Sequence, residues 1–362
     1  MNRLSAIDAF SPALARVGAM LLRPFRLGDW IKMGFIGLLG GGLATFSLNT
    51  NVRAPMFPPH SGGGADDPWG EIEKAVRSVH LADYFHIIVG VLAIVLVISL
   101  IFMYLFCRFR FVLFDSVITG RPTVGRGWRQ YASQANRFFG FWLAFRLVSW
   151  GALALIVGAP LWHAYKSGVF NEDNSVATLF ELLASVVLGA IAVGAVMAIV
   201  STLMKDFIMP IMALDDFTLG DAWSTLGRVI ASEPGAWAGY LGMKVVFAIG
   251  VGIALAIAMV VAMIPAIIII GIPVAVLAIP GAFAFKAGAT AVAILLFVIA
   301  GLLAAAGFFC VYLIVIAPAT VFFTSYAFYF FGGRYPKLGA LLSPQPLPPS
   351  SAPQVIGTQP VA

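Results

Sequence analysis

Long apolar runs constrain the fold of this chain more than any other feature of its sequence. Residues 84–107, 140–165 and 177–204 are apolar almost throughout, and a much longer apolar stretch covers residues 237–316. A helix of about 20 apolar residues spans the hydrocarbon core of a bilayer, which is ~30 Å thick. Each run reaches that length, so the sequence predicts an all-α integral membrane protein.

Composition excludes several other classes of protein. Hydrophobic residues make up 61% of the 362 residues and charged residues only 10%, whereas a soluble domain holds roughly 25% charged residues. The net charge of +6 fits basic loops that face anionic headgroups, so we expect membrane lipids as partners and no nucleic acid. Cys107 and Cys310 belong to apolar runs, and the four histidines lack metal-ligand spacing. We therefore expect no metal and no cofactor.

About six transmembrane helices fit the apolar runs. We place them at residues 30–48, 84–107, 140–165, 177–204, 237–262 and 289–316. Three prolines interrupt residues 264–285, which we expect to form a broken, re-entrant segment, with a seventh crossing as the alternative. Residues 336–362 are expected to form a disordered, Pro-rich tail.

Lysine and arginine are distributed unevenly between the predicted loops. With the N-terminus inside, the inner segments hold most of the basic residues, including all the arginines of residues 108–137. The outer loops hold only the following: Arg53, Lys74, Arg77, Lys166 and Lys286. Because basic loops stay on the cytoplasmic side, the sequence predicts a multi-pass protein with a cytoplasmic N-terminus.

A Gly-x-Trp motif recurs where an amphipathic segment meets an apolar run. The three copies are Gly28-Asp29-Trp30, Gly140-Phe141-Trp142 and Gly235-Ala236-Trp237. Tryptophan favours the headgroup level, and glycine permits a sharp turn from an in-plane helix to a crossing helix. We interpret the chain as three repeats of an interfacial amphipathic helix plus a helical hairpin, in units 1–107, 108–204 and 205–335.

The second amphipathic segment shows the expected pattern most clearly. Trp128, Tyr131, Ala135 and Phe138 share one helical face, and arginines flank it. A basic amphipathic helix of this kind lies in the membrane interface. The alternative is that this face packs against the protein's own crossings.

Several residues are candidates for a functional site. Trp and basic residues near the inner interface are expected to contact lipid: Trp30, Trp128, Trp142, Arg146, Trp223, Trp237 and Lys244. Glu181, in the fourth predicted crossing, is the candidate for a polar pathway. The acidic residues Asp206, Asp215, Asp216 and Asp221 are expected in solvated turns and caps.

The segments that lead into the second and third amphipathic parts resemble one another, and a similar one follows the sixth crossing. They read FRFVLFDSVITG, DFIMPIMALDDFTLG and APATVFFTSYAFYFFGG. This layout over roughly residues 1–335 resembles the membrane domain of bacterial glycerophosphodiester phosphodiesterases and related bacterial multi-pass families. The resemblance implies a bacterial inner-membrane protein. The soluble catalytic barrel of those enzymes has no counterpart here, so the resemblance implies no activity.

Two functions remain open at the level of the sequence. Intramembrane enzyme signatures such as His-Glu-x-x-His and Gly-x-Ser-x-Gly are absent from the sequence, so we expect no enzymatic activity. The leading hypothesis is a scaffold that organises lipids or partner proteins at the cytoplasmic face. The alternative is a small-solute or lipid transporter or channel with its path near the Pro-interrupted segment.

Overall fold

The computed structural model describes residues 3–41, 81–167 and 176–342, and these ranges are helical almost throughout, without a strand. Five helical segments in them are long and apolar enough to cross a membrane. They are α4 (Leu81–Thr119), α6 (Ala132–Lys166), α7 (Val176–Leu203) with its continuation, α10 (Pro234–Lys286) and α11 (Thr290–Gly332). The prediction of an α-helical, multi-pass membrane protein is therefore confirmed.

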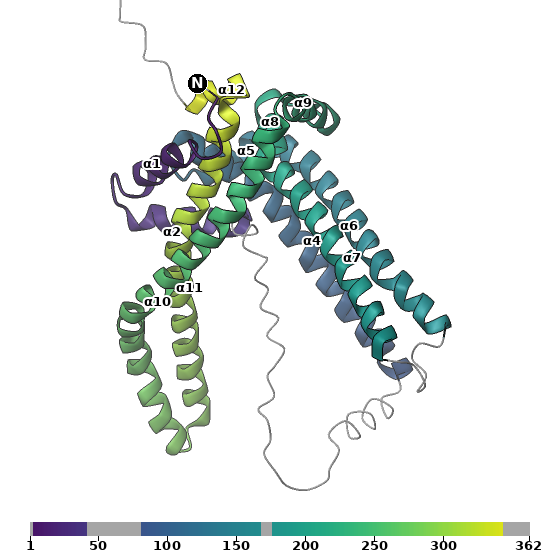
Figure 1. Cartoon of the computed structure of the whole chain (residues 1–362). Coiled ribbons are helices and arrows are strands. Elements are labelled where there is room, and N and C mark those ends of the chain that lie inside the picture. Colours follow the sequence, from purple (N-terminus) through teal and green to yellow (C-terminus); the bar gives the residue numbers. More distant parts are fainter. Residues whose placement is uncertain (1–2, 42–80, 168–175, 343–362) are drawn as a thin grey trace, which may run out of the picture.

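The long helices form two arms that diverge from one end of the molecule (Figure 1). The first arm consists of α4, α6 and α7, and the second of α10 and α11. Shorter helices gather where the arms meet: α1 (Phe10–Leu21), α2 (Leu27–Leu39), α5 (Val124–Gln130), α8 (Met209–Asp215), α9 (Leu219–Ser232) and α12 (Pro336–Leu342). We call these helices, together with the ends of the long helices that they contact, the platform.

The core of the protein lies in the platform. Residues 109–117 of α4, residues 204–212 and residues 316–332 of α11 are almost all buried. These ranges overlap the three segments compared above, which are residues 109–120, 206–220 and 317–333. Helices α4, α8 and α11 and the turn before α8 pack together. Along the arms, by contrast, most large apolar side chains are exposed, as expected of helices whose solvent is lipid.

Helix α2 packs closely against α11. A side chain at Gly34 would meet the backbone of Leu313, and one at Gly37 would meet Thr320, so both positions use the close approach that small residues allow. At ~1.5 Å per residue, the 13 residues of α2 extend about 20 Å. The predicted crossing at residues 30–48 is thus helical as far as Leu39, and its part beyond Gly41 lies outside the described residues.

The Gly-x-Trp motifs do not all form corners. Gly28 and Gly235 lie in the first turns of α2 and α10, as predicted. Gly140 instead lies inside α6, so the prediction of a corner there is wrong. Helix α6 continues straight into the platform because Trp142, only 4% exposed, packs against Phe106 and Phe138.

Two further predictions need correction. Residues 264–285 are not broken or re-entrant, because α10 is one helix of 53 residues with Pro265, Pro273 and Pro280 inside it. A proline removes one backbone hydrogen bond and bends a helix, but a full break would expose polar backbone to lipid. Residues 336–342 form α12 and pack against α11 and α8, while residues 343–362 of the predicted tail lie outside the described residues.

The contact between α2 and α11 makes a matched pair of substitutions informative. Gly34→Ala places a methyl group against the Leu313 backbone and should lower the free energy of unfolding by about 1–3 kcal/mol. Gly18→Ala in α1 meets no atom within 4 Å and should raise stability by about 0.5–1 kcal/mol through helix propensity. Thermal unfolding of both purified variants in detergent measures the difference, and equal shifts would contradict the packing described.

Candidate functional site: a buried ionic cluster

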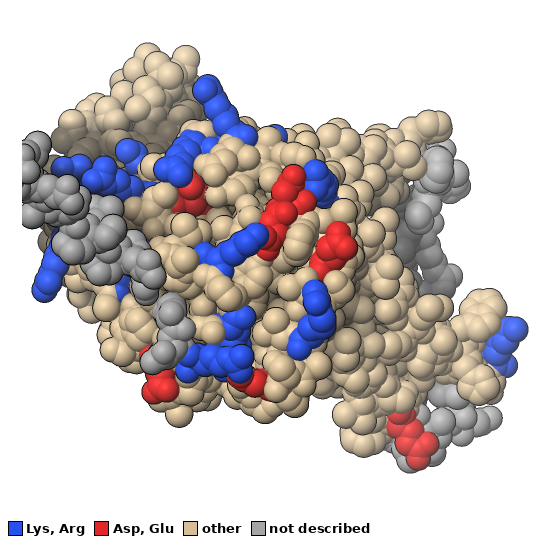
Figure 2. Space-filling model, turned by 90° about the horizontal axis from the view of Figure 1, so that it is seen from above, with Lys and Arg blue, Asp and Glu red and all other residues tan. Residues whose placement is uncertain are grey.

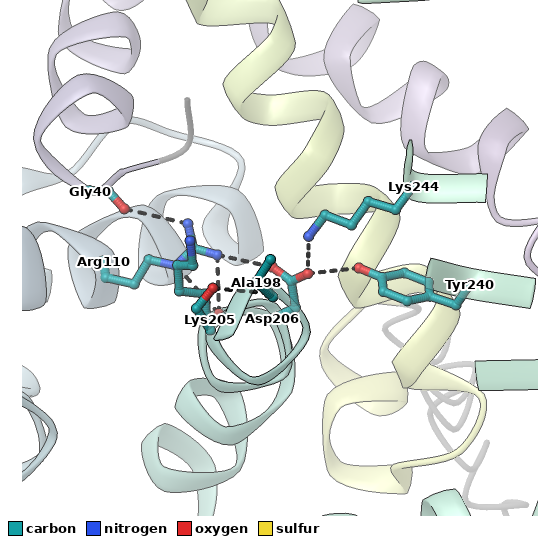
Figure 3. A network of polar contacts seen from close by, with 8 residues as sticks. Gly40, Arg110, Ala198, Lys205, Asp206, Tyr240 and Lys244 are labelled. Atoms are coloured by element: carbon teal, nitrogen blue, oxygen red, sulfur yellow. Dashed lines mark hydrogen bonds and ion pairs between the residues drawn. The ribbon is translucent and has the colours of Figure 1, made fainter. Parts of the chain in front are cut away.

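Charged side chains from both arms converge inside the platform (Figure 3). Helix α7 passes into α8 through a short π-helix, η1 (Met204–Ile208), which carries Lys205 and Asp206. Arg110 of α4 reaches this turn from within the first arm, and Tyr240 and Lys244 of α10 reach it from the second. All five side chains are at most 9% exposed. We call Arg110, Lys205, Asp206, Tyr240 and Lys244 the ionic cluster.

Asp206 is the acceptor at the centre of the cluster. Its Oδ1 accepts a hydrogen bond from Arg110 Nη2 at 3.2 Å. Its Oδ2 accepts one from the Tyr240 hydroxyl at 2.9 Å and one from Lys244 Nζ. A buried carboxylate is costly to desolvate unless donors surround it, and here two charged donors and one hydroxyl do so.

Arg110 also connects the cluster to the backbone. Its Nε and Nη2 donate to the Lys205 carbonyl oxygen at 3.3 and 3.1 Å, and its Nη1 points to the Gly40 carbonyl oxygen at 3.4 Å. Gly40 follows the last turn of α2, whose carbonyl groups have no partner within the helix. One guanidinium thus joins α4, η1 and the end of α2.

The cluster holds more positive than negative charge. Arg110, Lys205 and Lys244 surround one carboxylate, Asp206. Among the described residues, Lys205 forms no ion pair within 4 Å, and its Nζ lies 5.8 Å from the centroid of the Trp142 ring. Arg146 of α6 lies over the same ring, its Cζ also 5.8 Å from the centroid.

The structure places the predicted tryptophans mainly inside the protein. Trp142 and Trp237 are buried, and Trp128 and Trp223 are half-buried within the platform. Trp30 donates from Nε1 to the Leu21 carbonyl oxygen at 2.7 Å, which fixes the turn between α1 and α2. These rings contribute mostly to the core, because the platform provides apolar partners for them.

The two candidate cations differ. Arg146 is exposed on α6, in agreement with a residue near the lipid interface. Lys244 is only 5% exposed and pairs with Asp206, so it does not extend to the headgroups. Glu181 is exposed near the start of α7, far along the arm from the ionic cluster.

Sequence reasoning missed the centre of the site. Asp206 was expected in a solvated turn, but it is 4% exposed. The available signal was Lys205-Asp206 itself, a charged pair with apolar segments on both sides, in a chain where Arg110 also sits between aromatic residues. Asp221 behaves as predicted, because its backbone N–H meets the Thr218 side chain that caps α9.

The amphipathic face of the second unit packs inward. Tyr131 and Phe138 contact Phe111 of α4, and Ala135 is 1% exposed. Burial, together with the nearby Asp115 carboxylate, raises the pKa of Tyr131. This face therefore follows the alternative in which it packs on the protein's own helices.

A second ionic group fixes the N-terminal segment. Glu233, just before α10, accepts from Arg334 Nε at 3.1 Å and pairs with Arg3. Desolvation opposes the charge on Glu233, but the two arginines outweigh it and hold the pKa of this carboxyl below its usual value. Arg334 also donates to the Leu4 carbonyl oxygen at 3.0 Å. These groups border a surface cavity of about 450 Å³.

Loss of a buried carboxylate should destabilise the protein more than loss of a surface carboxylate. Asp206→Asn leaves Arg110 and Lys244 buried without their counter-charge and should destabilise the protein by about 3–5 kcal/mol. Asp216→Asn is the matched control, because Asp216 pairs with Arg137 at the surface and such pairs contribute about 1 kcal/mol or less. Asparagine also tolerates the positive φ at that position. Thermal unfolding in detergent checks both, and a mild effect of Asp206→Asn would contradict a structural role for the cluster.

Comparisons with known proteins add a family and no activity. No curated protein matches the chain, and no solved structure matches it. In the described residues, no group of three or more His, Cys, Asp or Glu side chains is placed to hold a metal ion. A model described as "Family of unknown function (DUF7544)" matches residues 4–341, which include the platform and both arms. The chain belongs to this family of unknown function.

Proposed function

We propose that this protein is a non-enzymatic scaffold that gathers anionic lipids at the cytoplasmic face of a bacterial inner membrane. In this proposal the platform lies at the cytoplasmic surface and the arms extend into the bilayer. The observation that carries it is the accumulation of exposed basic side chains on the platform, which Figure 2 shows from above.

Basic side chains are concentrated at one end of the molecule. The exposed ones at the platform end are Arg3, Arg23, Arg26, Lys32, Arg121, Arg126, Arg129, Arg137, Arg146, Arg228 and Lys337. Exposed acidic residues there are Asp8, Asp216 and Asp221, and the far ends of the arms carry Lys166 and Lys286. Each basic residue near an anionic surface adds on the order of 1 kcal/mol of attraction, so this distribution supports both the lipid role and a cytoplasmic platform.

The buried polar side chains support a scaffold over the transporter alternative. They lie at residues 110–116, 205–206, 244 and 320–325, all in or next to the platform. A path for a polar solute requires polar groups near the middle of the bilayer. The described parts of the arms instead present apolar side chains there, of the kind that contact acyl chains.

The finer topology is part of the same proposal. The first described range ends at Gly41, which lies beside Phe106 near the platform. Leu81 begins α4 at the far end of the first arm. In this proposal Gly41 and Leu81 lie on opposite sides of the bilayer, which supports a sixth crossing. Three repeated units are supported by the three core segments that pack together, and the resemblance to phosphodiesterase membrane domains supports a non-catalytic module.

Lipid selectivity tests the proposed function directly. We expect the full-length protein, reconstituted in mixed vesicles, to immobilise spin-labelled phosphatidylglycerol in preference to spin-labelled phosphatidylcholine. Raising the salt concentration should reduce this preference, because exposed charges are screened over a Debye length of about 10 Å at 0.1 M. Replacing Arg121 and Arg129 by Glu should reduce it too, while replacing Lys166 and Lys286 by Glu, which reverses the same number of charges, should have a smaller effect.

The same vesicles decide between the two functions. Equal immobilisation of both lipids would contradict the scaffold proposal. Passage of small solutes through these vesicles, at a rate above that of protein-free vesicles, would favour the transporter alternative.

A further inference from the structure

We infer that Lys205, Trp142 and Arg146 form a specific binding site for the phosphate group of an anionic phospholipid, at the junction of the first arm and the platform. The inference deepens the proposed function, on which it rests for the position of the platform at the headgroup level. It adds one defined site to a surface that otherwise attracts lipid through distributed charge.

The ammonium group of Lys205 lacks an acceptor of its own among the described residues, which is the first argument for a phosphate site. Its side chain is more than nine-tenths buried, with 9% exposure, and no described residue provides a carboxylate or hydrogen-bond acceptor for its ammonium group. The nearby Asp206 is already occupied by Arg110, Tyr240 and Lys244. The Lys205 ammonium nitrogen is not fully enclosed. A largely buried cation without a counter-charge of its own is costly, so an external anion that reaches it would stabilise the fold.

A second cation lies near the same tryptophan ring. Arg146 and Lys205 both lie over the Trp142 ring, each 5.8 Å from its centroid. Arg146 is exposed, so its long side chain can turn toward an anion beside Lys205. A phosphate group offers several acceptor oxygens, and the Arg and Lys donors bind such oxygens through charge-assisted hydrogen bonds.

The location favours a lipid as the source of the phosphate. The exposed cations Arg146 and Lys166 are 20 residues apart on α6, which is about 30 Å at ~1.5 Å per residue and matches the thickness of the hydrocarbon core. Charged side chains on a crossing helix favour the two interfaces, which places Arg146 at headgroup level in this proposal. Beyond Arg146, Leu147 and Val148 are exposed on α6 and Ile199 on α7, which gives acyl chains an apolar surface beside the site.

The test uses the full-length protein in neutral detergent, with unfolding followed as phosphatidylglycerol is added. We expect this lipid to raise the unfolding temperature of the wild type, and phosphatidylcholine to do so much less. Lys205→Met should bind phosphatidylglycerol about tenfold more weakly, because one charge-assisted hydrogen bond is lost. Lys286→Met, the same change at an exposed position at the far end of the second arm, should leave the affinity unchanged.

A second variant keeps the test decisive if Lys205→Met does not fold. Arg146→Gln alters an exposed side chain and should weaken phosphatidylglycerol binding while the lipid-free unfolding temperature stays the same. If the folded variants bound phosphatidylglycerol as tightly as the wild type, the phosphate site would be wrong. If the protein still preferred anionic lipid in vesicles in that case, the scaffold proposal would stand without this site.

Free phosphate distinguishes the source of the anion. Inorganic phosphate and glycerol phosphate, at matched ionic strength, should stabilise the wild type far less than phosphatidylglycerol. Equal stabilisation by either one, lost in Lys205→Met, would show that the site binds a soluble phosphate and would overturn the assignment to lipid.

Discussion

The buried carboxylate of Asp206 is the interaction on which the arrangement of the two arms depends. It accepts hydrogen bonds from Arg110 of the first arm and from Tyr240 and Lys244 of the second. Removing these charges from water is expensive, and only a geometry that satisfies all of them recovers the cost. The direction in which α10 leaves the platform is therefore tied to the position of η1. Aromatic contacts reinforce the same junction: the ring centroids of Phe207 and Trp237, for example, lie 4.7 Å apart.

The division between platform and arms follows from the solvent that each part meets. In the platform, aromatic and polar groups can find partners in the protein, and the three similar segments bury one another. Along the arms, apolar side chains contact lipid and add little to a protein core, because lipid tails are as apolar as leucine. Specific structure is concentrated at one end for this reason, and the excess positive charge of the ionic cluster lies at the same end.

The sequence predicts the fold better than it predicts the site. Apolar run length alone identifies α4, α6, α7, α10 and α11, because lipid forces the backbone into helices. The Gly-x-Trp motif does not distinguish a helix start such as Gly235 from a helix interior such as Gly140, since only tertiary packing decides which of them bends. The prolines of α10 were expected to break the segment, yet its backbone hydrogen bonds continue around them.

The ionic cluster could not be assembled from the sequence because its members lie far apart in the chain. Lys244 resembled a cation near an interface, for which extension to a phosphate is the usual outcome. Asp206 resembled a turn residue because three more acids follow it, up to Asp221. Only the packing of α4 and α10 against η1 turns these residues into partners.

The distance between the tips of the two arms tests most directly whether Asp206 holds the arms together. Spin labels at Lys166→Cys and Lys286→Cys, with Cys107 and Cys310 replaced by alanine, report this distance in lipid nanodiscs. A narrow distance distribution is expected when Asp206 is present, and a clearly broader or shifted one in Asp206→Asn, with Asp216→Asn unchanged. An unaltered distribution in folded Asp206→Asn protein would contradict the claim that this buried carboxylate fixes the two arms relative to each other.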